Sequence, residues 1–185
     1  MPGEFHVVLG VSGSIAAYKA ADIVRLMTGR GWRVSVMMTQ SATRYVGPLT
    51  FQALTGRVVA HGRFEDLPDS VYAHIDLAQD TDAILLAPAT ANLLAKIAHG
   101  LADDIVTATV LARSVPLIVA PAMNDRMWAN PATQDNLALL RARGVQVLDV
   151  EHGELACGRM GAGRLLPPEQ IVEAVARLLD AAEPI

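Results

Sequence analysis

The chain has 185 residues, of which 52% are hydrophobic, and this is ample material for the core of one domain spanning residues 1–185. A net charge of −4 disfavours a general nucleic-acid surface, because phosphate backbones are held chiefly by clustered Lys and Arg, and the single cysteine, Cys157, excludes an internal disulfide and a multi-cysteine metal site. No apolar run approaches the roughly 20 residues that span a bilayer, and the first residues lack the basic head of a signal peptide, so the sequence predicts a cytoplasmic protein.

The first part of the chain alternates short apolar runs with apolar residues at helical spacing. His6 begins a β-branched run that breaks at a Gly- and Ser-rich turn, after which the helical pattern continues as far as a pair of glycines. The elements expected up to residue 70 are a strand over His6–Gly10, a helix over Ile15–Met27, a strand over Arg33–Met38, a short helix from Pro48 to Leu54, a minor strand at Val58–Val59 and a surface loop over Gly62–Ser70.

The second part continues the same alternation. Its expected elements are a helix over Tyr72–Ala78, a strand over Ala83–Ala87, helices over Leu93–His99 and Asp103–Ala112, a strand over Val115–Ala120, a helix over Pro131–Arg143, a strand over Val145–Val150 and a C-terminal helix over Glu169–Ala182. Strands that alternate with helices, without an internal repeat, predict an α/β fold whose mostly parallel sheet is covered by helices on both faces.

The turn after the first strand has the residue types of an anion site. Residues 10–15 read Gly-Val-Ser-Gly-Ser-Ile, so backbone N–H groups and two hydroxyls can converge at the start of a helix. The spacing is neither the dinucleotide fingerprint nor the Walker pattern, and no acidic residue ends the second strand, so a mononucleotide fits better than NAD. The alternative is a tight turn in which Ser14 only caps a helix.

Two other strands also end in small or polar residues, which a parallel sheet would bring to the same edge. Thr39 and Ser41 follow the second strand, and the third buried strand ends at Pro-Ala-Thr-Ala-Asn over residues 88–92. Small side chains would allow a planar ligand to lie against the backbone. Thr90 and Asn92 would serve equally well as helix caps, so this loop alone does not decide between the two roles.

The fourth predicted strand is followed by Pro-Ala-Met-Asn-Asp-Arg-Met-Trp at residues 121–128. Pro121 cannot donate to a sheet ladder, so the strand should stop there and place Asn124 at its carboxyl end, where parallel α/β sheets bind ligands. A helix starting near Asn124 would put Asn124 and Trp128 on one face. The alternative is a loop packed by two Met and a Trp.

Two further residues carry titratable groups outside these loops. His74 flanks an apolar pair, and an isolated histidine of this kind is more often a structural residue than a base. Cys157 lies in a Gly-rich stretch that also holds Arg159 and Arg164. The glycines would act as hinges of a mobile flap, and the arginines would bind an anion and favour the thiolate.

Taken together, these stretches resemble the homo-oligomeric flavin-containing cysteine decarboxylases, and within them most closely the phosphopantothenoylcysteine decarboxylases of coenzyme A biosynthesis. The matching pieces are Gly-Ser-Ile-Ala-Ala-Tyr-Lys at 13–19, His74 before Ile75, Pro-Ala-Thr-Ala-Asn at 88–92, Pro-Ala-Met-Asn-x-x-Met-Trp at 121–128 and Ala-Cys-Gly at 156–158. The likeness covers nearly the whole chain. It implies a flavodoxin-like, Rossmann-type three-layer sandwich with FMN as the cofactor.

The resemblance also implies a role for individual residues. FMN would be held by Gly13, Ser14, Ile15, Thr39, Ser41, Thr90, Ala91, Asn92 and Leu93. His74 would assist oxidation of the substrate, Asn124 would bind its carboxylate or amide, and Cys157 would act as an acid. Further substrate contacts would come from Met127 and from three cationic residues, Lys19, Arg159 and Arg164.

The implied reaction converts 4'-phosphopantothenoyl-L-cysteine to 4'-phosphopantetheine. A cysteine carboxylate has no electron sink, so FMN would first oxidise the thiol to a thioaldehyde. Loss of carbon dioxide then gives an enethiolate, which is reduced again with a proton from Cys157. The alternatives are a decarboxylase of peptidyl C-terminal cysteine and a non-catalytic FMN carrier or regulatory subunit.

The resemblance further implies a homo-oligomer, either a trimer or a dodecamer, with flavin and substrate at subunit contacts. Such contacts would account for the apolar excess of the chain. The possible partner is a phosphopantothenate–cysteine ligase, present either as a fused domain or as a separate chain. We expect no metal, no nucleic acid and no membrane as partners.

Overall fold

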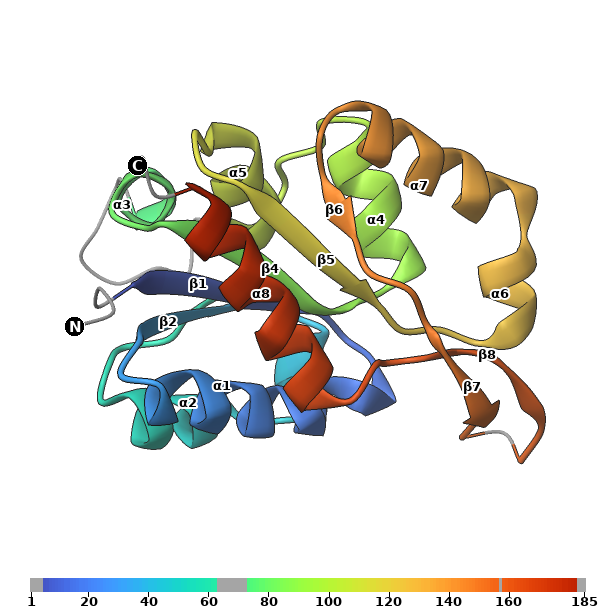
Figure 1. Ribbon diagram of the computed structural model, residues 1–185, viewed down its shortest axis with the longest axis horizontal. Coiled ribbons are helices and arrows are strands. Elements are labelled where there is room, and N and C mark those ends of the chain that lie inside the picture. Colours follow the sequence, from blue (N-terminus) through green and yellow to red (C-terminus); the bar gives the residue numbers. More distant parts are fainter. Residues whose placement is uncertain (1–4, 63–72, 157, 183–185) are drawn as a thin grey trace.

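The computed structural model describes residues 5–62, 73–156 and 158–182, and it has the expected α/β architecture in three layers (Figure 1). The central layer is a six-stranded sheet in the order β3-β2-β1-β4-β5-β6, and all of its pairings are parallel. Its strands are β1 (His6–Val11), β2 (Arg33–Met38), β3 (Ala60–His61), β4 (Ala83–Ala89), β5 (Leu117–Pro121) and β6 (Gln146–Val147). Every residue of β1, β4 and β5 is buried, which is why these strands read as continuous apolar runs in the sequence.

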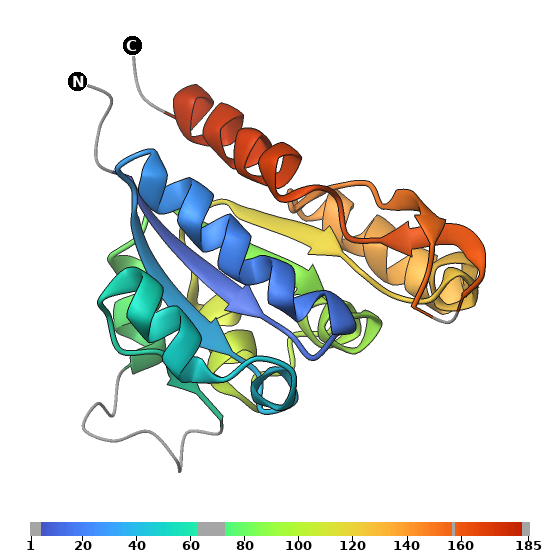
Figure 2. The same ribbon diagram turned by 90° about the horizontal axis from the view of Figure 1, so that it is seen from below.

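Helices cover both faces of the sheet (Figures 1 and 2). One apolar cluster joins the sheet to α1 (Lys19–Gly29), α2 (Pro48–Thr55) and α8 (Pro168–Ala182). A second cluster on the opposite face joins it to α3 (Ala73–Gln79), α4 (Ala91–Ala98), α5 (Ile105–Ala112) and α7 (Pro131–Ala142). Among the described helices, none is long and apolar enough to cross a membrane.

Two elements lie beyond the carboxyl ends of the strands. The short helix α6 (Asp125–Ala129) follows β5 directly. An antiparallel hairpin of β7 (Glu151–Glu154) and β8 (Met160–Arg164) projects next to α6 (Figure 1). The Gly-rich stretch that the sequence indicated as a flap therefore contains a pair of strands, which its composition did not predict.

Several expected boundaries need correction. The helix expected over Ile15–Met27 is divided into a 3-10 helix, η1 (Ile15–Tyr18), and α1, because the Ser14 hydroxyl accepts from Ala16 N and tightens the first turn. A further 3-10 helix, η2 (Ala42–Arg44), follows β2.

The two edge strands also differ from expectation. The strand expected over Val145–Val150 is only β6, because this edge strand pairs with two residues of β5 before the chain leaves for the hairpin. The minor strand expected at Val58–Val59 lies two residues later, where Ala60 and His61 pair with the end of β2. Of the loop expected over Gly62–Ser70, residues 63–70 lie outside the described part of the chain.

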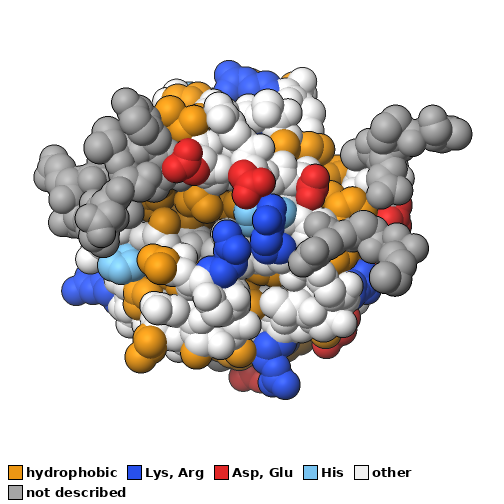
Figure 3. Space-filling view, turned by 90° about the vertical axis from the view of Figure 1, so that its left-hand side faces the viewer, with side chains coloured by type: hydrophobic (Ala, Val, Ile, Leu, Met, Phe, Trp, Pro, Cys, Tyr) orange, Lys and Arg blue, Asp and Glu red, His pale blue; other side chains and the backbone are white. Residues whose placement is uncertain are grey.

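A network of polar side chains surrounds His6 at the end of the sheet where β1 begins. Figure 3 faces that end of the molecule and shows basic and acidic side chains gathered beside a histidine. His6 is 3% exposed; its Nδ1 donates to the carbonyl oxygen of Asp80, and its Nε2 lies 2.9 Å from Ser35 Oγ. Arg57 Nε donates to the same Ser35 oxygen at 3.0 Å. Burial, followed by the charge of Arg33, lowers the pKa of His6, so the folded protein favours its neutral form.

Candidate active site

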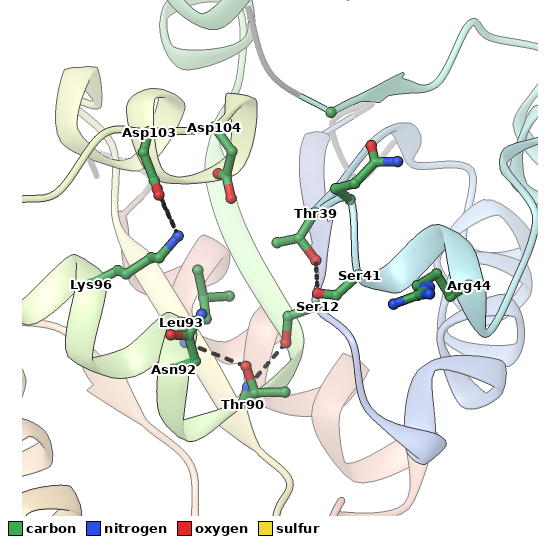
Figure 4. A pocket seen from close by; sticks show the side chains of 12 residues that line it. Ser12, Thr39, Ser41, Arg44, Thr90, Asn92, Leu93, Lys96, Asp103 and Asp104 are labelled. Carbon is green, nitrogen blue, oxygen red and sulfur yellow. Dashed lines mark hydrogen bonds and ion pairs between the residues drawn. The ribbon is translucent and has the colours of Figure 1, made fainter.

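Three loops at the carboxyl edge of the sheet surround a cavity of about 570 Å³ (Figure 4). They follow β1, β2 and β4, the three adjacent strands for which the sequence predicted polar or small residues at the strand ends. Residues from all three loops line the cavity, including Ser12, Thr39, Ser41, Thr90 and Asn92. The structure therefore brings together the segments that the sequence analysis selected separately.

The β1 and β4 loops are joined through Ser12. Its hydroxyl donates to Pro88 O at 2.7 Å. The same oxygen accepts from Thr90 N at 3.0 Å (Figure 4). Ser12 N also donates to Pro88 O, at 3.2 Å. Thr90 is in turn the N-cap of α4, since its side-chain oxygen accepts from Leu93 N at 3.3 Å. Thr90 is thus a helix cap, as one of the two alternatives for it proposed, and it also lines the cavity.

The β1 and β2 loops approach each other at Gly13. A Cβ atom built on Gly13 would lie 2.5 Å from Ser41 Oγ and 3.0 Å from the Ser41 carbonyl carbon, so this close approach requires glycine. Ser41 Oγ lies 3.1 Å from Thr39 Oγ1, which also accepts from Ala42 N at 3.2 Å. The glycine in this turn therefore sets the distance between two hydroxyl-bearing loops.

Ser14 differs from Ser12 in exposure and in hydrogen bonding. It is partly exposed, and its oxygen accepts from Ala16 N at 3.2 Å as the N-cap of η1. Among the described residues, none accepts the Ser14 hydroxyl proton. This hydroxyl can therefore donate to an anion in the adjoining cavity.

An ion pair closes the far wall of the first cavity. Lys96 Nζ donates to both carboxylate oxygens of Asp103, at 2.7 and 2.6 Å, and both residues line the cavity. The hydrogen bond from Lys96 lowers the pKa of Asp103, so this carboxyl is charged at neutral pH. The sequence analysis did not single out this pair, because two oppositely charged residues seven positions apart, on either side of a turn, carry no distinctive pattern.

A second cavity, of about 740 Å³, adjoins the first and shares Thr90 with it. One side is formed by Gly13, Ser14 and Ile15, and the other by Asn124 and Met127 together with residues of the hairpin and its flanks. The lining also includes Tyr18 and Tyr45, which the sequence analysis did not select. The wall is largely apolar with a few polar groups, as small-molecule sites commonly are.

Asn124 is held at this cavity by its capping role. It is the N-cap of α6, and its Oδ1 accepts from Arg126 N at 2.9 Å. Because Oδ1 is bonded to the backbone of the first turn of α6, the orientation of the side-chain amide is fixed relative to β5. The helix expected near Asn124 is confirmed, and Trp128 N donates to Asn124 O within it.

The hairpin is docked against this same turn through glycine positions of β8. Met123 N donates to Gly163 O at 2.8 Å, and a Cβ atom on Gly163 would lie 2.3 Å from Met123 O. A Cβ atom on Gly161 would lie 2.7 Å from Asp125 Cβ. Gly163 has φ +136°, which an L side chain rarely adopts. The missing side chains therefore let β8 lie directly on the segment that carries Asn124.

The three cationic residues predicted to contact the substrate differ in their surroundings. Lys19 and Arg164 line the second cavity. Arg164 Nε lies 3.4 Å from Glu151 across the hairpin, so its charge is partly neutralised. Arg159 is not among the residues that line either cavity, and its guanidinium lies 3.6 Å from Asp125 Oδ1. Lys19 is thus the predicted cation most directly placed at the cavity.

His74 and Cys157, the remaining two predicted residues, are not among the described residues that line the two cavities. His74 lies in the first turn of α3, a helix that packs against α5, and it is not among the residues that line the two cavities. Cys157 lies outside the described residues, although Ala156 before it lines the second cavity. No group of three or more His, Cys, Asp or Glu side chains arranged to hold a metal ion is found in the described ranges.

Comparison with known proteins shows the family of the chain and its relatives. A family model described as Flavoprotein matches residues 1–180. The coenzyme A biosynthesis bifunctional protein CoaBC of Vibrio vulnificus is 46% identical over 166 residues, which is 90% of this chain and 41% of the relative. The chain thus spans about two fifths of the length of the curated relatives it matches.

Two solved structures share the fold over nearly the whole chain. A mutant of PPC decarboxylase complexed with pantothenoylaminoethenethiol superposes with a TM-score of 0.85 at 32% identity, covering 96% of this chain and 100% of that one. The FMN-dependent cysteine decarboxylase SpaF gives a TM-score of 0.81 at 34% identity, covering 97% of each chain.

Proposed function

The chain belongs to the Flavoprotein family, and we propose that it binds FMN and decarboxylates 4'-phosphopantothenoyl-L-cysteine to 4'-phosphopantetheine. The observation that supports this most is the likeness, over nearly the whole chain, to a PPC decarboxylase solved with pantothenoylaminoethenethiol bound. The kinship with bifunctional proteins of coenzyme A biosynthesis supports the same substrate.

The loops around the first cavity, together with the side of the second cavity formed by Gly13, Ser14 and Ile15, fit the flavin mononucleotide. The close approach at Gly13 brings Ser41 of the β2 loop beside the β1 turn, and the Ser14 hydroxyl has a proton to donate to a phosphate. We assign the holding of FMN to Gly13, Ser14, Ile15, Thr39, Ser41 and the segment Thr90–Leu93. Bound FMN would supply a two-electron oxidation of the substrate thiol and the later return of those electrons.

The side of the second cavity that Asn124 and Met127 form is assigned to the cysteine end of the substrate. Asn124 binds its carboxylate or amide, since the amide of a fixed Asn can donate to a carboxylate oxygen. Met127 contributes an apolar wall. Lys19 and Arg164 supply positive charge for an anionic substrate with a phosphate arm, and Arg159 is assigned only a secondary part, because it faces Asp125.

The hairpin excludes water during the reaction. The thioaldehyde would be the electron sink for loss of carbon dioxide, and the resulting enethiolate would need the two electrons returned by bound FMN and one proton, in a site from which water is excluded. Cys157, carried by the hairpin, is assigned as the acid that delivers this proton. An acid in this role must carry its proton when the enethiolate forms and must lie within reach of it.

His74 is proposed to act in the site of a neighbouring copy of the chain. Within one chain it does not line the cavities, whereas a homo-oligomer with its sites at subunit contacts would bring a second copy to the cavity mouth. Apolar side chains exposed at this mouth support such a contact, among them Ile15 at 62% and Tyr18 at 59%. As the family resemblance implies, we propose a trimer or a dodecamer, and the bifunctional relatives support a phosphopantothenate–cysteine ligase as a partner domain or chain.

The test is carbon dioxide release by the FMN-loaded protein from 4'-phosphopantothenoyl-L-cysteine without added reductant. A peptide ending in cysteine serves as the comparison substrate. Release only from the phosphopantothenoyl substrate is the expected result. Release only from the peptide would instead support the peptidyl-cysteine decarboxylase, and a yellow protein inert on both would support an FMN carrier.

Asn124→Asp isolates the substrate end of the site. Aspartate caps a helix as well as asparagine does, so α6 should keep its start, but it places a negative charge where the substrate carboxylate is proposed to bind. We expect unchanged FMN affinity and a fall in turnover of roughly a hundredfold. Loss of FMN from this variant would contradict the role assigned to Asn124.

A further inference from the structure

The turn after β1 carries two serines, and their surroundings differ in a way that separates their roles. Ser12 is 1% exposed and its hydroxyl is already both donor and acceptor, whereas Ser14 is partly exposed and retains a proton to donate. We infer that Ser12 is a positioning residue, which holds the β4 loop at the correct distance from the β1 loop for FMN, and that of the two hydroxyls only that of Ser14 donates to the phosphate of the cofactor. This inference rests on the proposed FMN site.

The chemistry of a phosphate supports the division. Ionised phosphate oxygens only accept hydrogen bonds, so a ligand residue must have a donor available. The single proton of the Ser12 hydroxyl is committed to Pro88 O at 2.7 Å. Its second hydrogen bond uses a lone pair, which accepts from Thr90 N at 3.0 Å. Ser12 therefore has no donor left for the cofactor, although it lies on the cavity wall.

The link made by Ser12 extends into the first turn of α4. Thr90 N is bonded to Ser12, and Thr90 Oγ1 accepts from Leu93 N at 3.3 Å, so one hydroxyl fixes the residue that starts the helix (Figure 4). The residues after Thr90 are those assigned to FMN. Because Ser12 N also donates to Pro88 O at 3.2 Å, loss of the hydroxyl would leave one link between the loops and would remove the acceptor for Thr90 N.

Removal of the hydroxyl should consequently weaken FMN binding without removing any contact to FMN. In Ser12→Ala the Thr90 N–H loses its buried acceptor, so the β4 loop can move away and FMN must order it on binding. We expect the dissociation constant for FMN to rise roughly tenfold and the visible circular dichroism of bound FMN to change. Ser12→Thr, which keeps the hydroxyl, should restore both values.

The experiment measures FMN titrations, visible circular dichroism and amide hydrogen exchange at Thr90 in the full chain. In the FMN-free protein, Thr90 should exchange faster in Ser12→Ala than in the wild type or Ser12→Thr. Ser14→Ala is the matched control, for which FMN affinity should fall while Thr90 exchange stays at the wild-type rate. If Ser12→Ala does not fold, Ser12→Cys, which keeps the size but weakens the hydrogen bonds, replaces it.

The possible failures are distinguishable. If Ser12→Ala only lowers the melting temperature and binds FMN with wild-type affinity and dichroism, Ser12 is merely structural and the inference is wrong. If Ser12→Thr fails to restore FMN affinity while Thr90 exchange is normal, the positioning role is also wrong. If the wild-type chain itself takes up no FMN, the proposed function fails, and the role of Ser12 toward FMN fails with it.

Discussion

Two regions of the cavity wall are assembled in opposite ways. The loops after β1 and β4 are joined through the Ser12 hydroxyl, which accepts from Thr90 N, and the loop after β2 lies against this pair at Gly13, with its own Thr39 and Ser41 hydroxyls in contact. The β7–β8 hairpin is joined to the Asn124 turn through backbone atoms and through the absence of side chains at Gly161 and Gly163. The first region can therefore be altered by removal of the Ser12 hydroxyl as well as by a methyl group added at Gly13, whereas the second is altered by an added methyl group.

This difference predicts that the two regions fail separately. The hydroxyl-linked loops are assigned to FMN, whereas the hairpin lines the second cavity, where the substrate is proposed to bind. A change in the loops should reduce cofactor affinity, and a change under the hairpin should reduce turnover while the cofactor stays bound. The following variants test that separation, beginning with the largest expected effect.

Gly163→Ala should have the largest effect. The added Cβ atom would lie 2.3 Å from Met123 O, and the φ of +136° is unfavourable for alanine. We expect a loss of about 3 kcal/mol of unfolding free energy, or release of the hairpin from the Asn124 turn, with turnover reduced roughly a hundredfold. Urea unfolding, FMN titration and carbon dioxide release measure the three quantities.

The control for this variant is Gly144→Ala. Gly144 also has a positive φ, +80°, but nothing lies within 4 Å of an added Cβ atom. It should therefore lose about 1 kcal/mol of stability and keep its turnover. Equal losses of turnover in both variants would show that backbone strain, and not the docking of β8, explains the effect at Gly163.

Gly13→Ala is the matching change in the hydroxyl-linked loops. Its Cβ atom would lie 2.5 Å from Ser41 Oγ, so the β1 and β2 loops must separate. We expect FMN affinity to fall on the order of tenfold or more, with less than about 2 kcal/mol lost from stability. Gly29→Ala, with nothing within 4 Å, is the control and should leave FMN binding unchanged. Wild-type FMN affinity in Gly13→Ala would refute the close-approach argument.

The His6 network lies at the opposite end of the sheet and should affect stability alone. The pKa of His6 is lowered by burial and by Arg33, so below the unfolded value of about 6.5 the unfolded chain binds a proton that the folded chain does not. Stability should therefore fall as the pH decreases from 6.5 toward the folded pKa, by at most about 1.4 kcal/mol per pH unit for this proton. Thermal melts between pH 8 and pH 5.5 measure it.

His6→Gln is the control for this pH dependence. It removes the titrating group while its amide can still bond to Ser35. The acid-side slope should become shallower in this variant, and FMN affinity at neutral pH should match the wild type. An unchanged slope would mean that other groups cause the acid sensitivity.

Asp125→Asn should have the smallest effect. Asp125 and Arg159 form an ion pair at 3.6 Å with partly exposed side chains, and such pairs contribute little. We expect the free energy of unfolding to fall by less than about 0.5 kcal/mol and turnover to change by less than about threefold. Arg30→Gln is the control, because it breaks the ion pair between Arg30, the C-cap of α1, and Glu173 on α8. A large loss of turnover in Asp125→Asn alone would mean that the hairpin depends on this ion pair and not on its backbone contacts.

The parallel sheet could be predicted because its central strands are buried on both faces and therefore appear as apolar runs. The loops could be selected because Ser14, Thr39 and Thr90 all follow such runs, and parallel strands bring their carboxyl ends to one edge. Asn124 was predictable for the same reason, with Pro121 marking the strand end. Position along a strand thus carried most of the information about the site.

The hairpin and its docking could not be predicted in the same way. The strands β7 and β8 contain Gly153, Gly161 and Gly163, which weaken any strand pattern. Gly161 and Gly163 matter because the Met123–Asp125 segment packs against them. Such a contact between distant segments cannot be predicted from the sequence. The ion pairs of Asp103 and of Arg159 likewise depend on which residues lie nearby in the folded chain. The sequence therefore could not show that Arg159 lies beside Asp125 and does not line the cavity that is proposed to bind the substrate.

Cofactor binding is the premise on which both regions depend, and one measurement tests it most directly. The purified chain is titrated with FMN while flavin fluorescence is followed, and the cofactor released on denaturation is identified by mass spectrometry. We expect saturation at one FMN per chain, an absorption spectrum of oxidised flavin for the bound cofactor, and FMN as the released compound. A chain that shows no saturable uptake of FMN would contradict the assignment of the hydroxyl-linked loops and the function built on them.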